Sequence, residues 1–212
     1  MEQVNGEKPR LTLTDQLRVR FKGILDPIGR FFNRLGLMPN TMTLLGLAGN
    51  VIGAIFLARG QMLIGGIIIL LMGPVDALDG TMARLRGMGG SFGAFVDSVT
   101  DRYSELIIFG GLIFFYAQQA NLIGTILVFA AAAGSVLVSY VRSRGQSLGW
   151  DTKVGILTRF ERYAVLAPAL ILNAVFANTA LWGIAIIAVF ANITALQRII
   201  DVRRQYYQGL KQ

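Results

Sequence analysis

Long stretches without a charged side chain constrain this chain more than any other feature of its sequence. Four of them fill over half of the 212 residues, at 35–58, 60–75, 106–141 and 163–197. A transmembrane helix needs about 20 mostly apolar residues, so each of the two longer stretches has room for a helical hairpin. This pattern excludes an ordinary soluble domain, a disordered chain and a nucleic-acid-binding protein with a solvated basic face.

Breaks in the apolar pattern predict an all-α integral membrane protein with six transmembrane helices. We expect the helices at residues 40–58, 62–84, 94–116, 122–144, 160–177 and 181–204. Before them, between Thr14 and Leu37, apolar residues recur every three or four positions with basic residues between them. That spacing is typical of an amphipathic helix lying on a membrane surface.

The basic residues predict how these helices are oriented. The chain carries 20 Lys and Arg against 12 Asp and Glu, a net charge of +8. The first, third and fifth connections contain one basic residue, Arg59. Because Lys and Arg are enriched in cytoplasmic loops, both termini are expected in the cytoplasm, beside the anionic lipid of the plasma membrane. The expected divisions are a cytoplasmic N-terminal segment (1–38), a six-helix membrane domain (39–206) and a cytoplasmic tail (207–212).

Four aspartates lie where membrane helices should be apolar. Asp76 and Asp79 end the second expected helix, and Asp97 and Asp101 begin the third. Spacings of three and four place each pair on one helical face, and antiparallel neighbours would bring both pairs to one depth. Carboxylates so close repel one another and are costly to desolvate, which a divalent cation relieves. Because the chain has no Cys and no His, we expect oxygen-ligated Mg²⁺ or Mn²⁺.

Small residues and an arginine frame these carboxylates. Gly80 follows Asp79 directly, and Gly93 precedes the second pair by four positions. Neither glycine has a side chain that would block a ligand. Ala83 is also small, and the planar guanidinium of Arg84 suits a phosphate group. Metal-binding carboxylates, open backbone and an arginine together indicate a diphosphate site.

In chain order these residues form Asp-x2-Asp-Gly-x2-Ala-Arg-x8-Gly-x3-Asp-x3-Asp, from residue 76 to residue 101. This pattern resembles, without a substitution, the signature of the CDP-alcohol phosphotransferases, also called CDP-alcohol phosphatidyltransferases. The amphipathic helix, six membrane helices and cytoplasmic-side active site resemble that family too. The resemblance implies a metal-dependent transfer. An acceptor hydroxyl attacks the lipid-side phosphorus of a CDP-linked lipid such as CDP-diacylglycerol, and CMP leaves.

The resemblance also implies roles for individual residues. Asp76, Asp79, Asp97 and Asp101 would surround two metal ions, and Asp101 would accept the proton of the attacking hydroxyl. The CDP-lipid would be contacted by two elements, namely Asp79, Gly80, Ala83, Arg84 and Gly93, and Pro39, Asn40 and Thr43 at the start of the first membrane helix. The family resemblance suggests a homodimer, which small residues in the expected helices make physically possible.

Arginines in the second half of the chain indicate an acceptor that carries its own phosphate. Arg142 lies near the end of the fourth expected helix, Arg159 and Arg162 lie at the start of the fifth, and Arg198 lies inside the sixth. A guanidinium inside a membrane bundle needs a partner or water. An acceptor phosphate would supply that partner and orient a hydroxyl toward Asp101.

This half of the chain resembles the phosphatidylinositol-phosphate synthase branch of the family. Arg159-Phe160-Glu161-Arg162 and Gln197-Arg198 match that branch. The departures from it are Ser143, Gly145 and Gln146, and Arg142 where lysine is common. Inositol phosphate is therefore the expected acceptor, with glycerol 3-phosphate, giving phosphatidylglycerol phosphate, as the alternative. Two other classes stay open: a UbiA-type prenyltransferase with Asp-rich helix ends, and a cation transporter with a carboxylate site.

Overall fold

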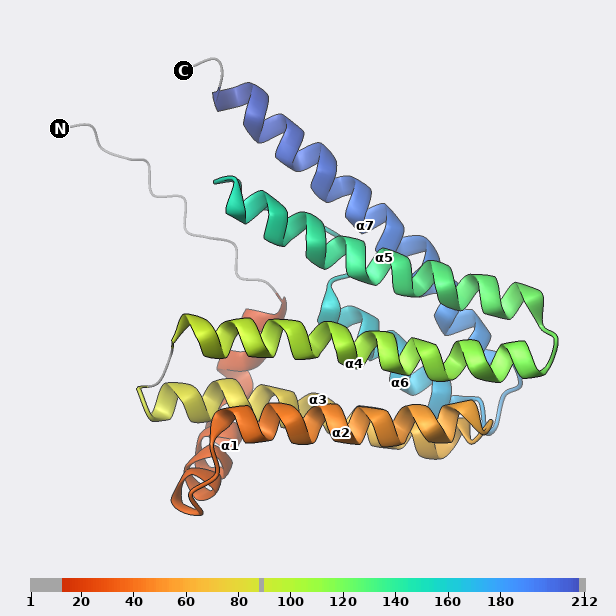
Figure 1. Cartoon of the computed structure of the whole chain (residues 1–212), viewed down its shortest axis with the longest axis horizontal. Coiled ribbons are helices and arrows are strands. Elements are labelled where there is room, and N and C mark those ends of the chain that lie inside the picture. Colours follow the sequence, from red (N-terminus) through yellow and green to blue (C-terminus); the bar gives the residue numbers. More distant parts are fainter. Residues whose placement is uncertain (1–12, 88–89, 210–212) are drawn as a thin grey trace.

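The computed structural model in Figure 1 describes the backbone of residues 13–87 and 90–209, and their side chains from residue 23 onward. The described residues contain helices only, which confirms the all-α fold class. In chain order these are α1 (Leu13–Arg34), α2 (Pro39–Ala58), α3 (Met62–Leu85), α4 (Ser91–Gln118), α5 (Leu122–Ser147), α6 (Arg159–Leu172) and α7 (Thr179–Gly209).

Most helix boundaries fall within a few residues of those expected from the sequence, but α6 and α7 differ. α6 ends at Leu172 instead of residue 177. The chain turns there because the side chain of Asn173 accepts a hydrogen bond from the backbone N–H of Ala180, at 3.2 Å. α7 then continues unbroken to Gly209, so its last residues belong to the segment expected to be a tail.

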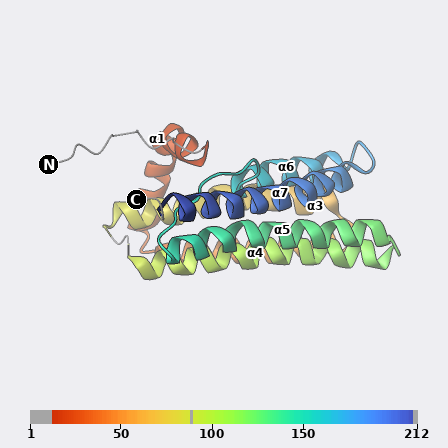
Figure 2. The ribbon, with the colours of Figure 1, turned by 90° about the horizontal axis from the view of Figure 1, so that it is seen from above.

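Six of the helices pack in a closed ring. α2 packs against α3 and α4, α5 against α4 and α7, and α6 against α3 and α7. Seen from above, α4 and α5 lie in one layer, while α6 and α7 lie in the other (Figure 2). α1 is outside the ring and packs against α3.

The core of the ring receives a fully buried side chain from each of its six helices. These residues are Leu57, Ile69, Leu112, Val128, Leu170 and Ile187. Small residues bring the helices close enough for this packing. At Gly111, an added Cβ would lie 2.4 Å from the carbonyl oxygen of Ala54, so α2 and α4 can meet there only through a glycine. The expected role of small residues in close helix packing is confirmed at this position.

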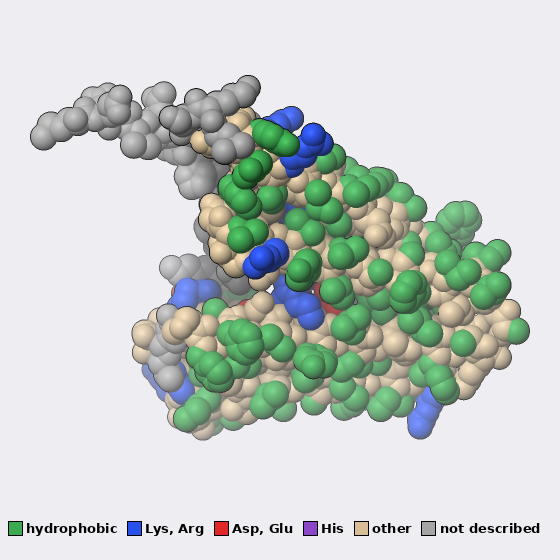
Figure 3. Space-filling model, turned by 45° about the horizontal axis from the view of Figure 1, so that its top comes forward, with side chains coloured by type: hydrophobic (Ala, Val, Ile, Leu, Met, Phe, Trp, Pro, Cys, Tyr) green, Lys and Arg blue, Asp and Glu red, His purple; other side chains and the backbone are tan. Residues whose placement is uncertain are grey.

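Many large hydrophobic side chains are exposed on the outer surface of the bundle, and Figure 3 shows them on one face. Among the described residues, four helices are long and apolar enough to cross a membrane, namely α2, α3, α5 and α7. α4 is long enough, but its first 15 residues include Asp97, Asp101, Arg102 and Glu105, and α6 has only 14 residues. The structure therefore supports a membrane protein, while the expectation of six spans is not confirmed.

α1 has two apolar faces with different surroundings. Leu25 and Phe32 pack with a small cluster formed by Met42 and Met82. On the other side, the side chains of Ile24 and Phe31 are exposed, as is that of Leu35 just after the helix. This arrangement is compatible with the amphipathic helix expected from the sequence.

Candidate active site

Three of the four aspartates form a compact acidic group. Asp76 lies near the end of α3, and Asp97 and Asp101 lie near the start of α4. One carboxylate oxygen from each lies within 4.8 Å of the other two. α2 packs against both α3 and α4 and thereby holds the two helices at this separation. The structure thus brings together the acids that the spacing placed on facing helices.

Asp79 lies outside that compact group and has its own partner. Its side chain is buried, and its Oδ2 accepts a hydrogen bond of 2.6 Å from the hydroxyl of Thr43. Thr43 is in the first turn of α2, whose start is set by Pro39 at the first helical position. This hydrogen bond links α2 to α3, the two elements that the family resemblance implied as separate contacts of the CDP-lipid.

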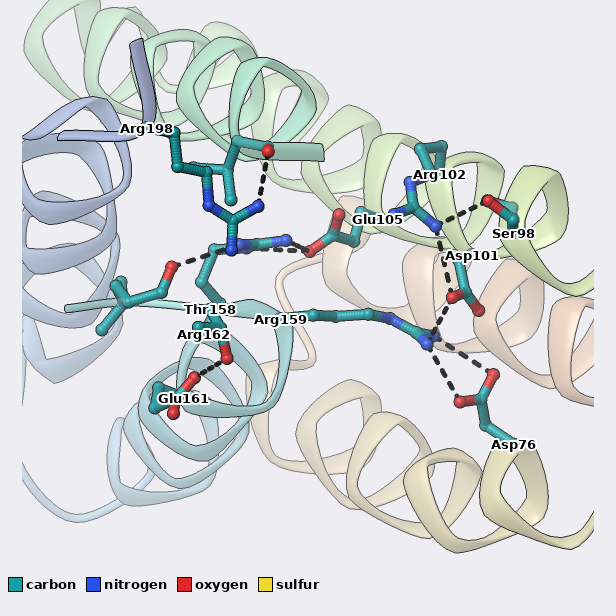
Figure 4. A network of polar contacts seen from close by, with 12 residues as sticks. Asp76, Ser98, Asp101, Arg102, Glu105, Thr158, Arg159, Glu161, Arg162 and Arg198 are labelled. Atoms are coloured by element: carbon teal, nitrogen blue, oxygen red, sulfur yellow. Dashed lines mark hydrogen bonds and ion pairs between the residues drawn. The ribbon is translucent and has the colours of Figure 1, made fainter. Parts of the chain in front are cut away.

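Arg159 joins the acidic group from α6 (Figure 4). Its Nη1 and Nη2 donate to the two carboxylate oxygens of Asp76, at 3.0 and 3.1 Å. Nη1 also lies 2.5 Å from Oδ2 of Asp101. The side chains of Arg159 and Asp76 are about one-third exposed, so this pair is partly open to solvent.

The residues of the acidic group fit a divalent metal. All their donors are carboxylate oxygens, the ligands that Mg²⁺ and Mn²⁺ prefer. Oδ1 of Asp101 is buried and has no hydrogen-bond partner among the described residues. A buried carboxylate oxygen without a partner is costly unless a cation or a proton satisfies it. The group can therefore hold a metal, as expected.

Space for a ligand lies beside the acids. A Cβ added at Gly93 would meet no atom of the described residues within 4 Å, and one added at Gly80 would meet only Nη1 of Arg84, at 3.6 Å. Arg84 is exposed, and its Nη2 donates to the hydroxyl of Thr81. Ala83 is half-buried on the same helix, and Asn40 is exposed at the start of α2. These positions are all at the end of the bundle that carries the aspartates.

A second ionic contact lies deeper in the bundle, between Arg162 and Glu105. Nε and Nη2 of Arg162 donate to Oε1 of Glu105, at 2.9 and 2.6 Å, and both side chains are at most 5% exposed. Nη1 also donates to the carbonyl oxygen of Leu157. The guanidinium of Arg162 is therefore engaged by the protein itself. Glu105 is four residues after Asp101 on the same helical face.

Arg198, which the sequence placed inside the bundle, is 4% exposed. Its Nη1 donates to the carbonyl oxygen of Val138 and its Nε to that of Val154, at 2.7 and 3.0 Å. It also lies close enough to Arg142 and Arg162 for their positive charges to act on it. Nε of Arg142 is buried and has no hydrogen-bond partner within the described part of the chain.

Arg102 is a further residue of this region that the sequence did not single out. It follows Asp101, lies 3.4 Å from its Oδ2, and donates to the backbone of Ser98 at 2.7 Å. Its charge also acts on Arg198. The arginines Arg102, Arg142, Arg162 and Arg198 thus form a positive region beside the acidic group.

The chain is similar in sequence to known proteins. A family model described as CDP-alcohol phosphatidyltransferase matches residues 36–195. A phosphatidylinositol phosphate synthase from Streptomyces avermitilis is 36% identical over 91% of this chain and 83% of its own length. An archaetidylinositol phosphate synthase from Pyrococcus horikoshii is 30% identical over 93% of this chain and its entire length.

Solved structures show the same similarity. The crystal structure of Mycobacterium tuberculosis phosphatidylinositol phosphate synthase with CDP-DAG bound aligns with a TM-score of 0.79 and 30% identity. The alignment covers 84% of this chain and 93% of that one. The same enzyme in complex with manganese and citrate also aligns with a TM-score of 0.79, at 29% identity, over 84% of this chain and 88% of that one.

Proposed function

Because the chain belongs to the CDP-alcohol phosphatidyltransferase family, we propose that it transfers the phosphatidyl group of CDP-diacylglycerol, or of a related CDP-lipid, to inositol phosphate. CMP is the other product. The compact group of Asp76, Asp97 and Asp101 carries this proposal, because phosphoryl transfer depends on cations that offset the charge of the diphosphate. Similar enzymes that bind CDP-DAG and manganese support the donor and the need for a metal.

The proposed metal ligands are Asp76, Asp79, Asp97 and Asp101. Two Mg²⁺ or Mn²⁺ ions, when bound, would neutralise charge on the diphosphate and polarise the phosphorus. Thr43 holds the carboxylate of Asp79 in place through its hydroxyl. Gly80, Ala83, Arg84 and Gly93, with Pro39 and Asn40 on the neighbouring helix, leave room for the cytidine diphosphate and offer it donors.

Asp101 is the proposed catalytic base. Its Oδ2 is shared by two arginines, whereas Oδ1 is buried without a partner among the described residues. Oδ1 can therefore take the proton as the acceptor oxygen forms its bond to the lipid-side phosphorus. The bond from that phosphorus to the CMP oxygen breaks in the same displacement. Such a base contributes about 10²–10⁴-fold to the rate.

Arg142, Arg159, Arg162 and Arg198 are the proposed site for the acceptor phosphate. Arg102 adds to their positive charge, and Glu105 is the acid buried among them. A dianionic phosphate would offset this excess charge. The four differ in what they can donate. Arg162 and Arg198 already have protein partners, whereas buried Nε atoms of Arg142 and Arg159 lack a partner among the described residues.

A reaction with separate acceptors tests the function. Purified protein, CDP-diacylglycerol and Mg²⁺ or Mn²⁺ would be incubated with inositol 1-phosphate, glycerol 3-phosphate, inositol or serine. We expect CMP release and a phosphatidylinositol phosphate product with the first acceptor, and loss of both in a chelator. Preference for glycerol 3-phosphate would change the acceptor to that of phosphatidylglycerol phosphate synthesis. Equal use of the free alcohols would contradict the arginine site.

The proposed enzyme is a plasma-membrane protein whose six helices, α2 to α7, all cross the bilayer. In this topology residues 1–38 form the cytoplasmic N-terminal segment, residues 39–206 the membrane domain and residues 207–212 the cytoplasmic tail. α1 then lies on the anionic membrane surface. Because the chain has no cysteine, single cysteines can test it. A thiol reagent that cannot cross the membrane should label R59C in intact cells and R203C only after lysis. The reverse result would invert the topology.

A homodimer is proposed as the working form. The membrane-facing surface offers apolar side chains and small residues for packing between copies. Cross-linking in native membranes, followed by mass measurement in detergent, should give a species of twice the chain mass. An active enzyme that is monomeric in both measurements would refute the dimer.

A further inference from the structure

Arg159 occupies carboxylate oxygens of two proposed metal ligands, Asp76 and Asp101. It binds both oxygens of Asp76 and also contacts Oδ2 of Asp101. Both acids belong to the group whose oxygens lie within 4.8 Å of one another. Mg²⁺ needs direct bonds of about 2.0–2.1 Å to such oxygens. A guanidinium lying across them therefore competes with the ion for position.

Charge repulsion also opposes the binding of Arg159 and a metal ion to the same acids at the same time. The four aspartates carry four negative charges when ionised, and Arg159 neutralises one of them. A divalent ion placed beside the guanidinium would meet a like charge in a partly desolvated site, where repulsion is poorly screened. Metal loading is easier if Arg159 leaves Asp76 and Asp101.

An arginine that leaves the aspartates needs another anion. The side chain runs past the ring of Tyr163, whose centroid is 5.7 Å from the guanidinium carbon. This contact can guide Arg159 but cannot neutralise it. The region beyond contains Arg142, Arg162 and Arg198, and their charge would repel Arg159 unless an anion lies between them. The phosphate of the acceptor has the charge and the oxygen atoms that suit a guanidinium.

We infer that Arg159 is an exchangeable positioning residue, bound either to Asp76 and Asp101 or to the acceptor phosphate, and that this exchange couples metal binding to acceptor binding. The inference rests on the proposed function for the identity of the anion. By linkage, the metal should tighten acceptor binding and the acceptor should tighten metal binding by the same factor. The acceptor should therefore bind firmly only when the metal is already bound.

Equilibrium binding of Mn²⁺ without CDP-lipid tests the exchange separately from turnover. Free Mn²⁺ would be measured by electron paramagnetic resonance for the full-length wild type, Arg159→Gln and Arg159→Lys. Removing the competing guanidinium should lower the Kd for Mn²⁺ at least about fivefold in the glutamine variant, the lower end of typical coupling. The lysine variant keeps the charge but loses the two-pronged contact, so its Kd should lie between the other two.

Inositol 1-phosphate serves as the probe for the second half of the exchange. It should lower the Kd for Mn²⁺ of the wild type, after correction for Mn²⁺ bound by the phosphate in buffer, and leave that of Arg159→Gln unchanged. Arg203→Gln is the matched control, because Arg203 is exposed on α7 and lies over the ring of Tyr207. It should bind Mn²⁺ as the wild type does.

Two results would overturn the inference. An unchanged or higher Kd for Mn²⁺ in Arg159→Gln would show that Arg159 does not compete with the metal. No effect of inositol 1-phosphate on the wild type would remove the coupling, and that measurement stands even if a variant does not fold. The assay with separate acceptors, run on the wild type, tests the proposed function alone. Failure of the exchange by Arg159 is therefore distinguishable from failure of the proposed function.

Discussion

Arg159 and Arg162 lie one turn apart on α6 and both bind carboxylates, but their surroundings differ sharply. Arg159 is about 30% exposed and shares its donors between Asp76 and Asp101. Arg162 is 2% exposed and directs two donors to one oxygen of Glu105. Arg159 is partly exposed and reaches two acids, so its ion pair can exchange partners. Arg162 is buried with one acid, so its ion pair fixes α6 against α4.

This difference shows why residue type alone does not assign a role. A partly solvated pair is stabilised little by its own attraction and can be replaced by other ions at small cost. A buried pair has already lost its hydration, so removal of one member leaves a charge that water cannot reach. We therefore expect changes at the first pair to affect chemistry and changes at the second to affect folding.

The largest effect is expected at the acid of the exchangeable pair. Asp101→Asn removes the proposed base and one metal ligand, so kcat for CMP release should fall about 10²–10⁴-fold. Arg159 keeps Asp76 as a partner in this variant, so the free energy of unfolding should fall less than in Glu105→Leu. Turnover assays and thermal unfolding in detergent measure both. Full activity in this variant would contradict the proposed mechanism.

The second prediction concerns the fixed pair. Glu105→Leu leaves the guanidinium of Arg162 buried without its acid and should lower the free energy of unfolding by about 3–5 kcal/mol. The double variant Glu105→Leu/Arg162→Met should recover most of that loss, since it removes the stranded charge. Asp76→Asn serves as the comparison at the exposed pair. If all three variants were equally stable, the distinction between the two pairs would be wrong.

Asp79 tests an intermediate case, because its carboxylate is buried but accepts a hydrogen bond from a neutral hydroxyl. Thr43→Val removes that donor. A hydrogen bond to a charged group contributes about 1.5–3 kcal/mol, so metal or CDP-lipid affinity should fall about tenfold or more. Thr41→Val, at an exposed position of the same helix, is the control. Unchanged affinity in Thr43→Val would mean that the hydrogen bond from Thr43 is not needed to orient the carboxylate of Asp79.

The smallest effect on folding is expected at Gly93. An alanine there would meet no described atom within 4 Å, and alanine favours a helix over glycine by up to about 1 kcal/mol. The variant should be as stable as the wild type or slightly more stable, yet its KM for the CDP-lipid should rise. Gly111→Ala, which would meet a backbone oxygen, should instead destabilise the fold. An unchanged KM at Gly93 would remove it from the ligand site.

The sequence predicted the helices well because uncharged stretches and turn residues mark them directly. It also predicted that the aspartates of α3 and α4 would meet, since helical spacing fixes which face each one occupies. It named Glu105 and Glu161 as the acids near the arginines, but it did not predict that Arg159 would pair with Asp76. Whether Arg159 reaches Asp76 depends on α6 packing beside α3, a contact between distant segments that no local pattern encodes. Arg198 likewise uses carbonyl oxygens, which every residue has and no sequence distinguishes.

The order of helices around the ring differs from their order of synthesis. α7, the last to be made, lies between α5 and α6, and α6 reaches the aspartates from beside α3. During biosynthesis α3 and α4 therefore present their acids before any arginine of α6 exists to bind them. Until α7 inserts, α5 and α6 each lack one neighbour and the ring stays open. Assembly of the acceptor side thus waits for the C-terminal helix, and a chain stopped after Leu172 would keep the acids but lack Arg198.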